Sequence, residues 1–187
     1  MNIDKTPIEG CYLIKPKVFK DDRGSFMETY NSQTFTELTG LNPKFVQDNQ
    51  SVSAYGTVRG LHFQEGKYAQ SKLVRVIEGE VLDLVVDLRP LSKTFKKSFS
   101  IKLSKENNFQ LFIPRGLAHG FSVLKQNTIF CYKCDNFYHK GSERGIRYND
   151  PELNLDWHLN QDDMILSKKD KDLPTLREYL DDRKAQG

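Results

Sequence analysis

The chain has 187 residues, of which 37% are hydrophobic and 28% are charged, a composition typical of a globular protein with a buried core. Its 28 basic and 25 acidic residues give a net charge of +3, too balanced for a nucleic-acid-binding protein. The apolar runs are too short to span a bilayer, and the start, MNIDKTPIEG, lacks the apolar region of a secretory signal. We therefore expect a cytoplasmic protein that binds neither nucleic acid nor membranes.

The N-terminal part of the chain predicts strands followed by a short helix. Strand-forming residues on both sides of a glycine-containing turn predict a hairpin over residues 12–30. The segment NSQTFTELTG predicts a helix that Asn31 or Ser32 caps and that Gly40 ends.

The rest of the chain is mostly strand. SKLVRVIEGEVLDLVVDLR, residues 71–89, predicts two strands about a turn, and KSFSIKLS, FQLFIPRG, HGFSVLK and TIFCYKC follow at short spacing. The tail PTLREYLDDRKA predicts a helix, with a capping box between Thr175 and Glu178. This order predicts a mainly β protein, a cupin-like jelly-roll sandwich or barrel with a few short helices and a C-terminal helix. We expect one domain over residues 1–187, with a helical appendage over about 160–187.

Three cysteines cannot all form disulfides, as expected in a reducing compartment. Cys131 and Cys134 have the C-x-x-C spacing of a zinc or redox pair. They lie in a segment with strand composition, however, where positions three apart point to opposite faces. We therefore expect two buried thiols and no metal at this motif.

RGLHFQ, residues 59–64, places a histidine in an otherwise ordinary strand. Strict alternation puts Gly60, His62 and Gln64 on one face and Leu61 and Phe63 on the other. Such polar residues point either outward to water or inward to a ligand cavity. Taken singly, His62 is more often a structural residue than a catalytic one, and alternation alone leaves the choice open.

A metal-binding role for this histidine can be tested against the motifs of metal-binding cupins, G-x5-H-x-H-x3-4-E and P-x-G-x2-H. His62 and His119 occupy histidine positions of these motifs. Gln64 replaces the second histidine, and no glutamate stands at the expected spacing. Two imidazoles and an amide are a poor ligand set for iron, manganese or zinc, so we predict no metal.

Several sequence motifs, taken together and in this order, are typical of a single protein family. RGLHFQ, KLVRVIEGEVLDLVVDLR, IPRGLAHGFSVL, YKC and YNDPELNLDW occur in order, between DDRGSFMET and LSKKD. In these motifs the chain resembles the dTDP-4-dehydrorhamnose 3,5-epimerase family over most of its length.

The resemblance implies epimerisation at C3 and C5 of dTDP-4-dehydro-6-deoxy-D-glucose, giving dTDP-4-dehydro-L-rhamnose through an enolate, with no metal or other cofactor. It implies His62 as the base, Tyr132 as the acid and Lys72 near the C4 oxygen, where an ammonium stabilises enolate charge. Asp170 matches the carboxylate that pairs with the histidine, although Asp172 lies close by.

The resemblance also implies a substrate-binding set and a homodimer. Its members are Arg23, Phe26, Glu28, Gln47, Asn49, Arg59, His119, Tyr138, Glu143 and Lys169. The N-terminal hairpin is expected to supply Arg23, Phe26 and Glu28 to the partner's site. On a regular strand Arg59 lies opposite His62, so it must reach round the strand end or act from a bulge.

Other functions fit the same scaffold. The chain can be a mono-epimerase, or an epimerase of another dTDP- or GDP-linked 4-keto sugar. A non-catalytic sugar-binding cupin is the rival outside enzymes, but it does not require both His62 and Tyr132. A sugar 3,4-ketoisomerase fits less well, because that group resembles sequences with a histidine at the position of Gln64.

Overall fold

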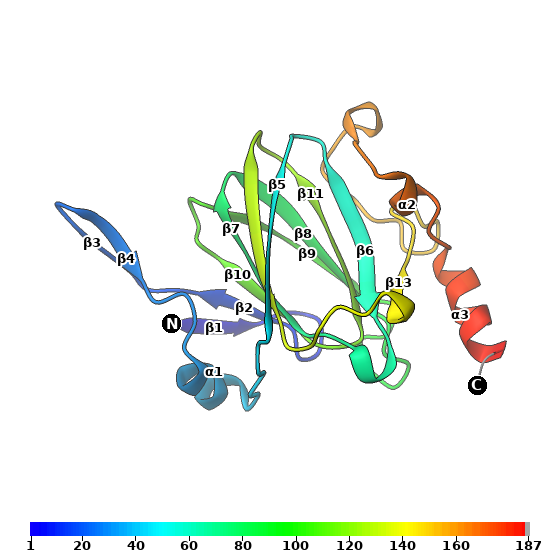
Figure 1. Ribbon diagram of the computed structural model, residues 1–187, viewed down its shortest axis with the longest axis horizontal. Coiled ribbons are helices and arrows are strands. Elements are labelled where there is room, and N and C mark those ends of the chain that lie inside the picture. The colour runs from blue at the N-terminus through cyan, green and yellow to red at the C-terminus, as the bar shows by residue number, and fades with distance from the viewer. Residues whose placement is uncertain (186–187) are drawn as a thin grey trace.

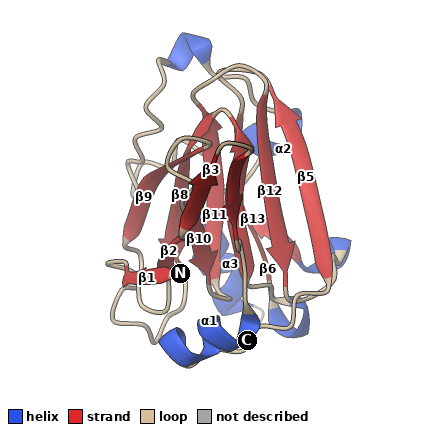
Figure 2. Cartoon of the chain, turned by 90° about the vertical axis from the view of Figure 1, so that its left-hand side faces the viewer, coloured by secondary structure: helices blue, strands red, loops and turns tan. Residues whose placement is uncertain are grey.

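The structure of the protein is a computed structural model, of which residues 1–185 are described. Its main body is two antiparallel sheets packed face to face (Figures 1 and 2). The six-stranded sheet has the order β1 (Asn2–Lys5), β2 (Tyr12–Lys15), β10 (Gln110–Ile113), β7 (Lys72–Glu78), β12 (Thr128–Cys134), β5 (Gln47–Ser53). The five-stranded sheet has the order β13 (Glu143–Gly145), β6 (Val58–Gln64), β11 (Leu117–Val123), β8 (Glu80–Asp87), β9 (Ser98–Ser104). This arrangement confirms the mainly β, jelly-roll-like prediction.

The helices are short and lie outside the sheets. They are α1 (Ser32–Thr39), α2 (Lys168–Lys171) and α3 (Leu176–Ala185), with single 3-10 turns at Gly66–Tyr68, Lys140–Ser142 and Gln161–Asp163. Asn31 caps α1 and Gly40 ends it in the left-handed conformation. The predicted capping box is confirmed, because the side chains of Thr175 and Glu178 each accept from the other's backbone N–H.

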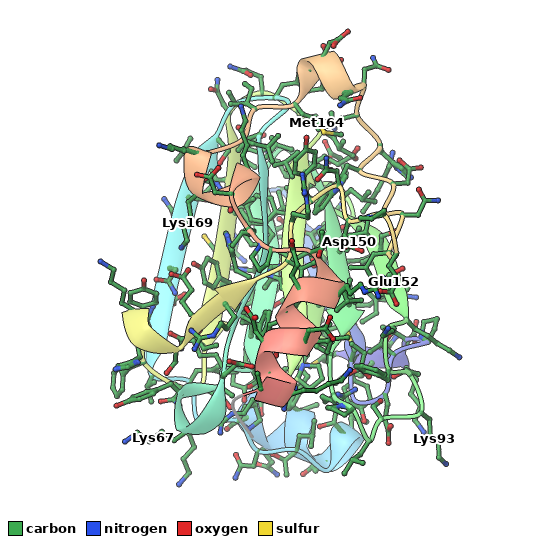
Figure 3. The ribbon with its side chains drawn as sticks, turned by 90° about the vertical axis from the view of Figure 1, so that its right-hand side faces the viewer. Lys67, Lys93, Asp150, Glu152, Met164 and Lys169 are labelled. Carbon is green, nitrogen blue, oxygen red and sulfur yellow. The ribbon has the colours of Figure 1, made fainter. Side chains whose placement is uncertain are left out.

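The core has two layers because the five-stranded sheet is buried on both faces. Its inner face packs against the six-stranded sheet, with Val85 and Phe130 among the buried contacts. Its outer face is covered by the C-terminal segment (Figure 3). Trp157, Leu176 and Tyr179 of this segment are buried against the sheet. Burial on both faces explains why the apolar run VLDLVVDL does not alternate with polar residues at every position.

The predicted hairpin over residues 12–30 is wrong in its extent. β2 pairs with β1 and β10 in the large sheet, and the hairpin is only β3 (Val18–Asp21) with β4 (Gly24–Met27). Pro16 lacks a backbone N–H and separates β2 from β3, and it cannot donate to a sheet ladder. The β3–β4 hairpin therefore projects from the body of the molecule (Figure 1).

Strict alternation also fails in β6. His119 of β11 lies opposite His62, but Phe121 lies opposite Arg59, so β6 contains one extra residue. The bulge includes Gly60, which has φ +119° and lies so close to β11 that a Cβ would come within 2.6 Å of the Gly120 Cα. The bulge turns Arg59, which alternation placed on the opposite face, to the same side as His62.

Candidate active site

A cavity of about 320 Å³ lies between the two sheets and is lined largely by polar residues. Seven predicted site residues line it: Arg59, His62, Lys72, His119, Tyr132, Lys169 and Asp170. They come from both sheets and from α2, so residues far apart in the chain meet here. His62 and the other strand residues of this set therefore point inward to a cavity, the alternative that the sequence left open.

His62 and Asp170 form a close pair at one wall of the cavity. The Nε2 of His62, on β6, lies 2.5 Å from Oδ1 of Asp170, on α2. Asp170 is buried, whereas Asp172 is exposed, so Asp170 is the partner. Ser167 caps α2: its hydroxyl donates to the second oxygen of Asp170 over 2.8 Å and accepts from the Asp170 N–H. Burial alone would raise the pKa of Asp170, but the hydrogen bonds from His62 and Ser167 outweigh it and lower the pKa below its usual value.

Tyr132 and Lys72 lie on the opposite wall, on β12 and β7 of the six-stranded sheet. In the register between these strands Tyr132 lies opposite Val74 and Lys72 opposite Cys134, so both point inward as their alternation predicts. The Lys72 ammonium is 5.9 Å from the centre of the Tyr132 ring. Burial raises the pKa of Tyr132 and lowers the pKa of Lys72. The phenol is therefore a neutral proton donor at neutral pH.

His119 forms a second imidazole–carboxylate pair deeper in the cavity. Its Nε2 lies 2.9 Å from Oδ2 of Asp83, which is fully buried on β8. Burial lowers the pKa of His119, and the attraction of Asp83 opposes this only in part. A neutral His119 that donates to Asp83 keeps its second nitrogen free to accept a hydrogen bond.

Lys169 begins a chain of polar contacts that continues from the cavity to a neighbouring loop. Its ammonium lies 2.6 Å from Glu143, whose carboxylate also accepts from the Tyr138 hydroxyl over 3.0 Å. The backbone N–H of Tyr138 donates to Gln47, and the Gln47 amide donates to Asn49. Four more predicted residues are therefore joined to the cavity. They are Gln47, Asn49, Tyr138 and Glu143.

His62 and Tyr132 belong to different sheets and line one cavity between them. A substrate carbon between them would meet a base on one face and a proton donor on the other, beside the Lys72 ammonium. Within residues 1–185, no three His, Cys, Asp or Glu side chains come together as a metal site requires. This arrangement would allow proton transfer at a carbon next to a carbonyl.

Known proteins match this chain over nearly its whole length. A family model for dTDP-4-dehydrorhamnose 3,5-epimerase matches residues 5–178. The dTDP-4-dehydrorhamnose 3,5-epimerase of Methanothermobacter thermautotrophicus is 48% identical over 175 residues, which cover 93% of this chain and 94% of that protein. The chain belongs to this family. It is accordingly an isomerase, and the predicted resemblance is confirmed.

Solved structures of the epimerase family share the fold. The crystal structure of dTDP-4-dehydrorhamnose 3,5-epimerase from Elizabethkingia anophelis NUHP1 has a TM-score of 0.93 and 53% identity, covering 95% of this chain and 97% of its own. The dTDP-6-deoxy-D-glucose-3,5-epimerase of Legionella pneumophila Philadelphia 1, in complex with dTDP-4-keto-L-rhamnose, has a TM-score of 0.90 and 44% identity, covering 94% and 93%.

Three of the predicted site residues of this epimerase lie away from the cavity. Arg23 and Phe26 lie on the projecting hairpin (Figure 1), where the Arg23 side chain is 90% exposed and Phe26 is 70% exposed. Arg23 pairs with Asp21 of its own hairpin, and Glu28, just after the hairpin, accepts from Asn31. A single chain therefore leaves these side chains outside the cavity.

Other residues in or next to this cavity were not predicted as site residues. Ser167 and Asp83 each support a site residue through a hydrogen bond, and each had a signal in the sequence. Ser-x-x-Asp at Ser167–Asp170 is a helix-capping pattern, and an aspartate inside a buried apolar run requires a partner. Gln64, predicted only as a missing metal ligand, bonds to backbone groups in two loops.

The cysteines follow their prediction in orientation. Cys131 and Cys134 are both free, and they face opposite sides of β12. Cys134 is buried whereas Cys131 is partly exposed, so one of the two predicted buried thiols is on the outer face.

In the part of the chain that the structure describes, no helix has the length and apolarity needed to cross a membrane.

Proposed function

We propose that this chain converts dTDP-4-dehydro-6-deoxy-D-glucose to dTDP-4-dehydro-L-rhamnose by inverting C3 and C5. The observation that carries the proposal is the placement of His62 and Tyr132 on opposite sheets about one cavity, with Lys72 on the same wall as Tyr132. Both carbons are next to the C4 carbonyl, so their protons become acidic when the resulting enolate is stabilised.

Each inversion is a balanced pair of proton transfers. His62 takes the proton from the carbon, the electron pair of the broken C–H bond forms a double bond to C4, and the π electrons of the C4 carbonyl move onto its oxygen. The Lys72 ammonium stabilises the resulting enolate oxygen. The Tyr132 hydroxyl then gives its proton to the opposite face of the carbon. The His62 imidazolium afterwards loses its proton to solvent and the Tyr132 phenolate regains one, so the cycle needs no oxidant or metal.

Asp170 serves this cycle by fixing the orientation of the His62 ring. The Nε2–H of His62 donates to the ionised Asp170, which leaves the other ring nitrogen free to take the substrate proton. The buried carboxylate also stabilises the imidazolium that forms. A base held in one tautomer needs no reorientation before each proton transfer.

The nucleotide part of the substrate would be bound by the cationic side chains of the cavity and by the loop that carries Tyr138. Arg59 and Lys169 supply positive charge for the diphosphate, and His119 supplies a neutral hydrogen-bonding group within the cavity. Tyr138, Glu143, Gln47 and Asn49 contact the nucleoside. The bound dTDP-4-keto-L-rhamnose in the Legionella pneumophila relative supports this class of ligand.

The working unit is proposed to be a homodimer of single-domain chains. The β3–β4 hairpin projects from the body and exposes two large apolar side chains, Phe19 and Phe26. Exposure of such side chains to water is unfavourable, as expected for a surface that contacts another protein. If this arm docks on a second copy, Arg23, Phe26 and Glu28 can complete the partner's site. The three free thiols support a reducing, cytoplasmic location.

Proton NMR in deuterated water tests the reaction directly. With dTDP-4-dehydro-6-deoxy-D-glucose, the enzyme should place deuterium at both C3 and C5 and give the L-rhamno product. Deuterium at C3 alone would identify a mono-epimerase instead. Tight binding without exchange would identify a sugar-binding protein, and turnover only of a GDP-linked sugar would overturn the nucleotide assignment.

A further inference from the structure

Gln64, two residues after His62 on β6, is one of the few buried polar side chains next to the site. Its amide nitrogen donates to the carbonyls of Tyr68, over 2.8 Å, and Phe137, over 3.1 Å. Its amide oxygen accepts from the backbone N–H of His139 over 2.6 Å. Both donors and the acceptor are therefore directed at backbone groups of two loops.

The two residues that Gln64 holds in the second loop are the neighbours of Tyr138. The loop is held at Phe137 and His139 by Gln64, and at Tyr138 itself by Gln47, which accepts the Tyr138 N–H over 3.0 Å. Gln64 also lies opposite Glu143 in the pairing of β6 with β13, and Glu143 accepts from the Tyr138 hydroxyl. Gln64 thus holds the backbone on both sides of Tyr138, and Glu143, on the strand paired with β6, holds its hydroxyl.

The ring of Tyr138 is nevertheless 55% exposed. An exposed aromatic side chain on a loop gains little from burial, so packing alone does not hold it in one place. Hydrogen bonds to the backbone of its loop must hold it, and Gln64, on a buried strand, supplies two of them, at the flanking residues Phe137 and His139. A loop that is ordered before the ligand arrives saves the free energy of ordering it on binding.

We propose that Gln64 is a positioning residue that holds the Tyr138 loop in its nucleotide-binding conformation in the free enzyme. The inference rests on the proposed function, because it takes Tyr138 as a contact of the nucleoside. Gln64 occupies the position of the second histidine in metal-binding cupins, and here both of its amide N–H groups and its amide oxygen bond to the loops. It supports nucleotide affinity and takes no part in proton transfer.

The test is Gln64→Met, which keeps the length of the side chain and removes all three hydrogen bonds. The dissociation constant for dTDP, measured by calorimetry, should rise about 10-fold, because several modest hydrogen bonds that order the loop are lost together. The KM for the dTDP sugar should rise by a similar factor, while kcat at saturation stays within about 3-fold of the parent enzyme. In hydrogen exchange, the Tyr138 amide, whose acceptor Gln47 is unchanged, should lose protection in the free variant and recover it when dTDP saturates the site.

Ser122→Ala is the matched control. Ser122 is fully buried and its hydroxyl donates to the Trp157 carbonyl over 2.6 Å, on the opposite side of the five-stranded sheet. The control should lower the melting temperature and leave the affinity for dTDP unchanged. If Gln64→Met does not fold, Gln64→Asn decides, because its shorter amide keeps a polar group but cannot reach both loops.

An unchanged dissociation constant in a folded Gln64 variant would overturn the inference, and so would a fall in kcat with no change in KM. These outcomes are distinct from failure of the proposed function, which the parent enzyme reports. A parent enzyme that neither binds dTDP nor epimerises its sugar overturns both proposals, whereas an active parent with an unaffected variant overturns only the role of Gln64.

Discussion

Ser167 supports the pair of His62 and Asp170 through two hydrogen bonds made by its hydroxyl oxygen. Its hydroxyl donates to Asp170 while accepting from the Asp170 backbone, so it fixes the carboxylate that orients His62. Ser167→Ala should lower kcat about 10-fold, since a hydrogen bond to a charged group contributes roughly 1.5–3 kcal/mol and part of it orients the base. Ser167→Thr keeps the hydroxyl and should retain most activity. Equal losses in both variants would show that the hydroxyl has no such role.

In the proposed mechanism, Lys72 sets how activity depends on alkaline pH. Burial lowers its pKa from 10.5, whereas burial raises the pKa of Tyr132 from 10.0. Because the ammonium is the active form, kcat/KM should fall as pH rises through the lowered pKa of Lys72. Lys72→Arg, if active, should move this limb to higher pH, because a guanidinium stays protonated. In Tyr132→Phe, the rate of the remaining solvent exchange should fall over the same alkaline pH range as in the parent enzyme. A limb that disappears in Tyr132→Phe would assign it to the phenol instead.

The candidate site shows how far single residues can be predicted. His62, Lys72 and Tyr132 line the cavity as expected, because motif positions and strand alternation agree for them. Arg59 could not be placed from alternation, since the bulge in β6 depends on how that strand pairs with β11.

At the scale of elements, the end of β8 is held by a buried carboxylate. Asp87 is fully buried and accepts hydrogen bonds from Arg89, Ser92 and Thr94, which hold the turn that leads to β9. Burial opposes its ionisation, but these bonds prevail and lower its pKa from 3.8 to about 2. Since the folded-state pKa is the lower one, Asp87 stabilises the fold above about pH 4, and this contribution is lost as pH falls towards 2.

Asp87→Asn should therefore remove a part of the acid sensitivity of the fold. Between pH 5 and pH 2, the unfolding free energy of the parent protein should fall by up to about 2 kcal/mol more than that of the variant. Urea denaturation at a series of pH values measures this difference. Parallel pH profiles for the two proteins would show that Asp87 is not ionised in the fold or is not selectively stabilised there.

The elements themselves were largely predictable, with instructive exceptions. Periodicity and turn residues identified β7, β8, α1 and α3, because local signals and tertiary structure agree there. The hairpin was placed too early because the apolar residues of β2 look the same whether it pairs with β3 or with β1 and β10. Pairing partners depend on contacts distant in sequence, which local patterns do not specify.

At the scale of the whole molecule, the exchange of hairpins between two copies can be tested by complementation. His62→Ala and Arg23→Ala should each be nearly inactive alone. If Arg23 acts in the partner's site, a mixed dimer contains one complete site, and random mixing should restore about a quarter of the parent activity. If Arg23 acts within its own chain, mixing the variants restores nothing. Light scattering on the same samples should show a dimer, and a monomeric active enzyme would contradict the exchange.

The central claim is that two side chains from opposite sheets divide the proton transfers between them. Measuring solvent deuterium exchange beside inversion, in His62→Ala and Tyr132→Phe, tests it most directly. His62→Ala should lose both processes by about 10²–10⁴-fold, because no base remains to form the enolate. Tyr132→Phe should lose inversion but retain exchange, since His62 can still remove a proton and return one to the same face. Both variants should keep their melting temperatures within a few degrees of the parent protein. Undiminished epimerisation in a folded His62→Ala protein, or equal loss of exchange and inversion in Tyr132→Phe, would contradict the division of roles.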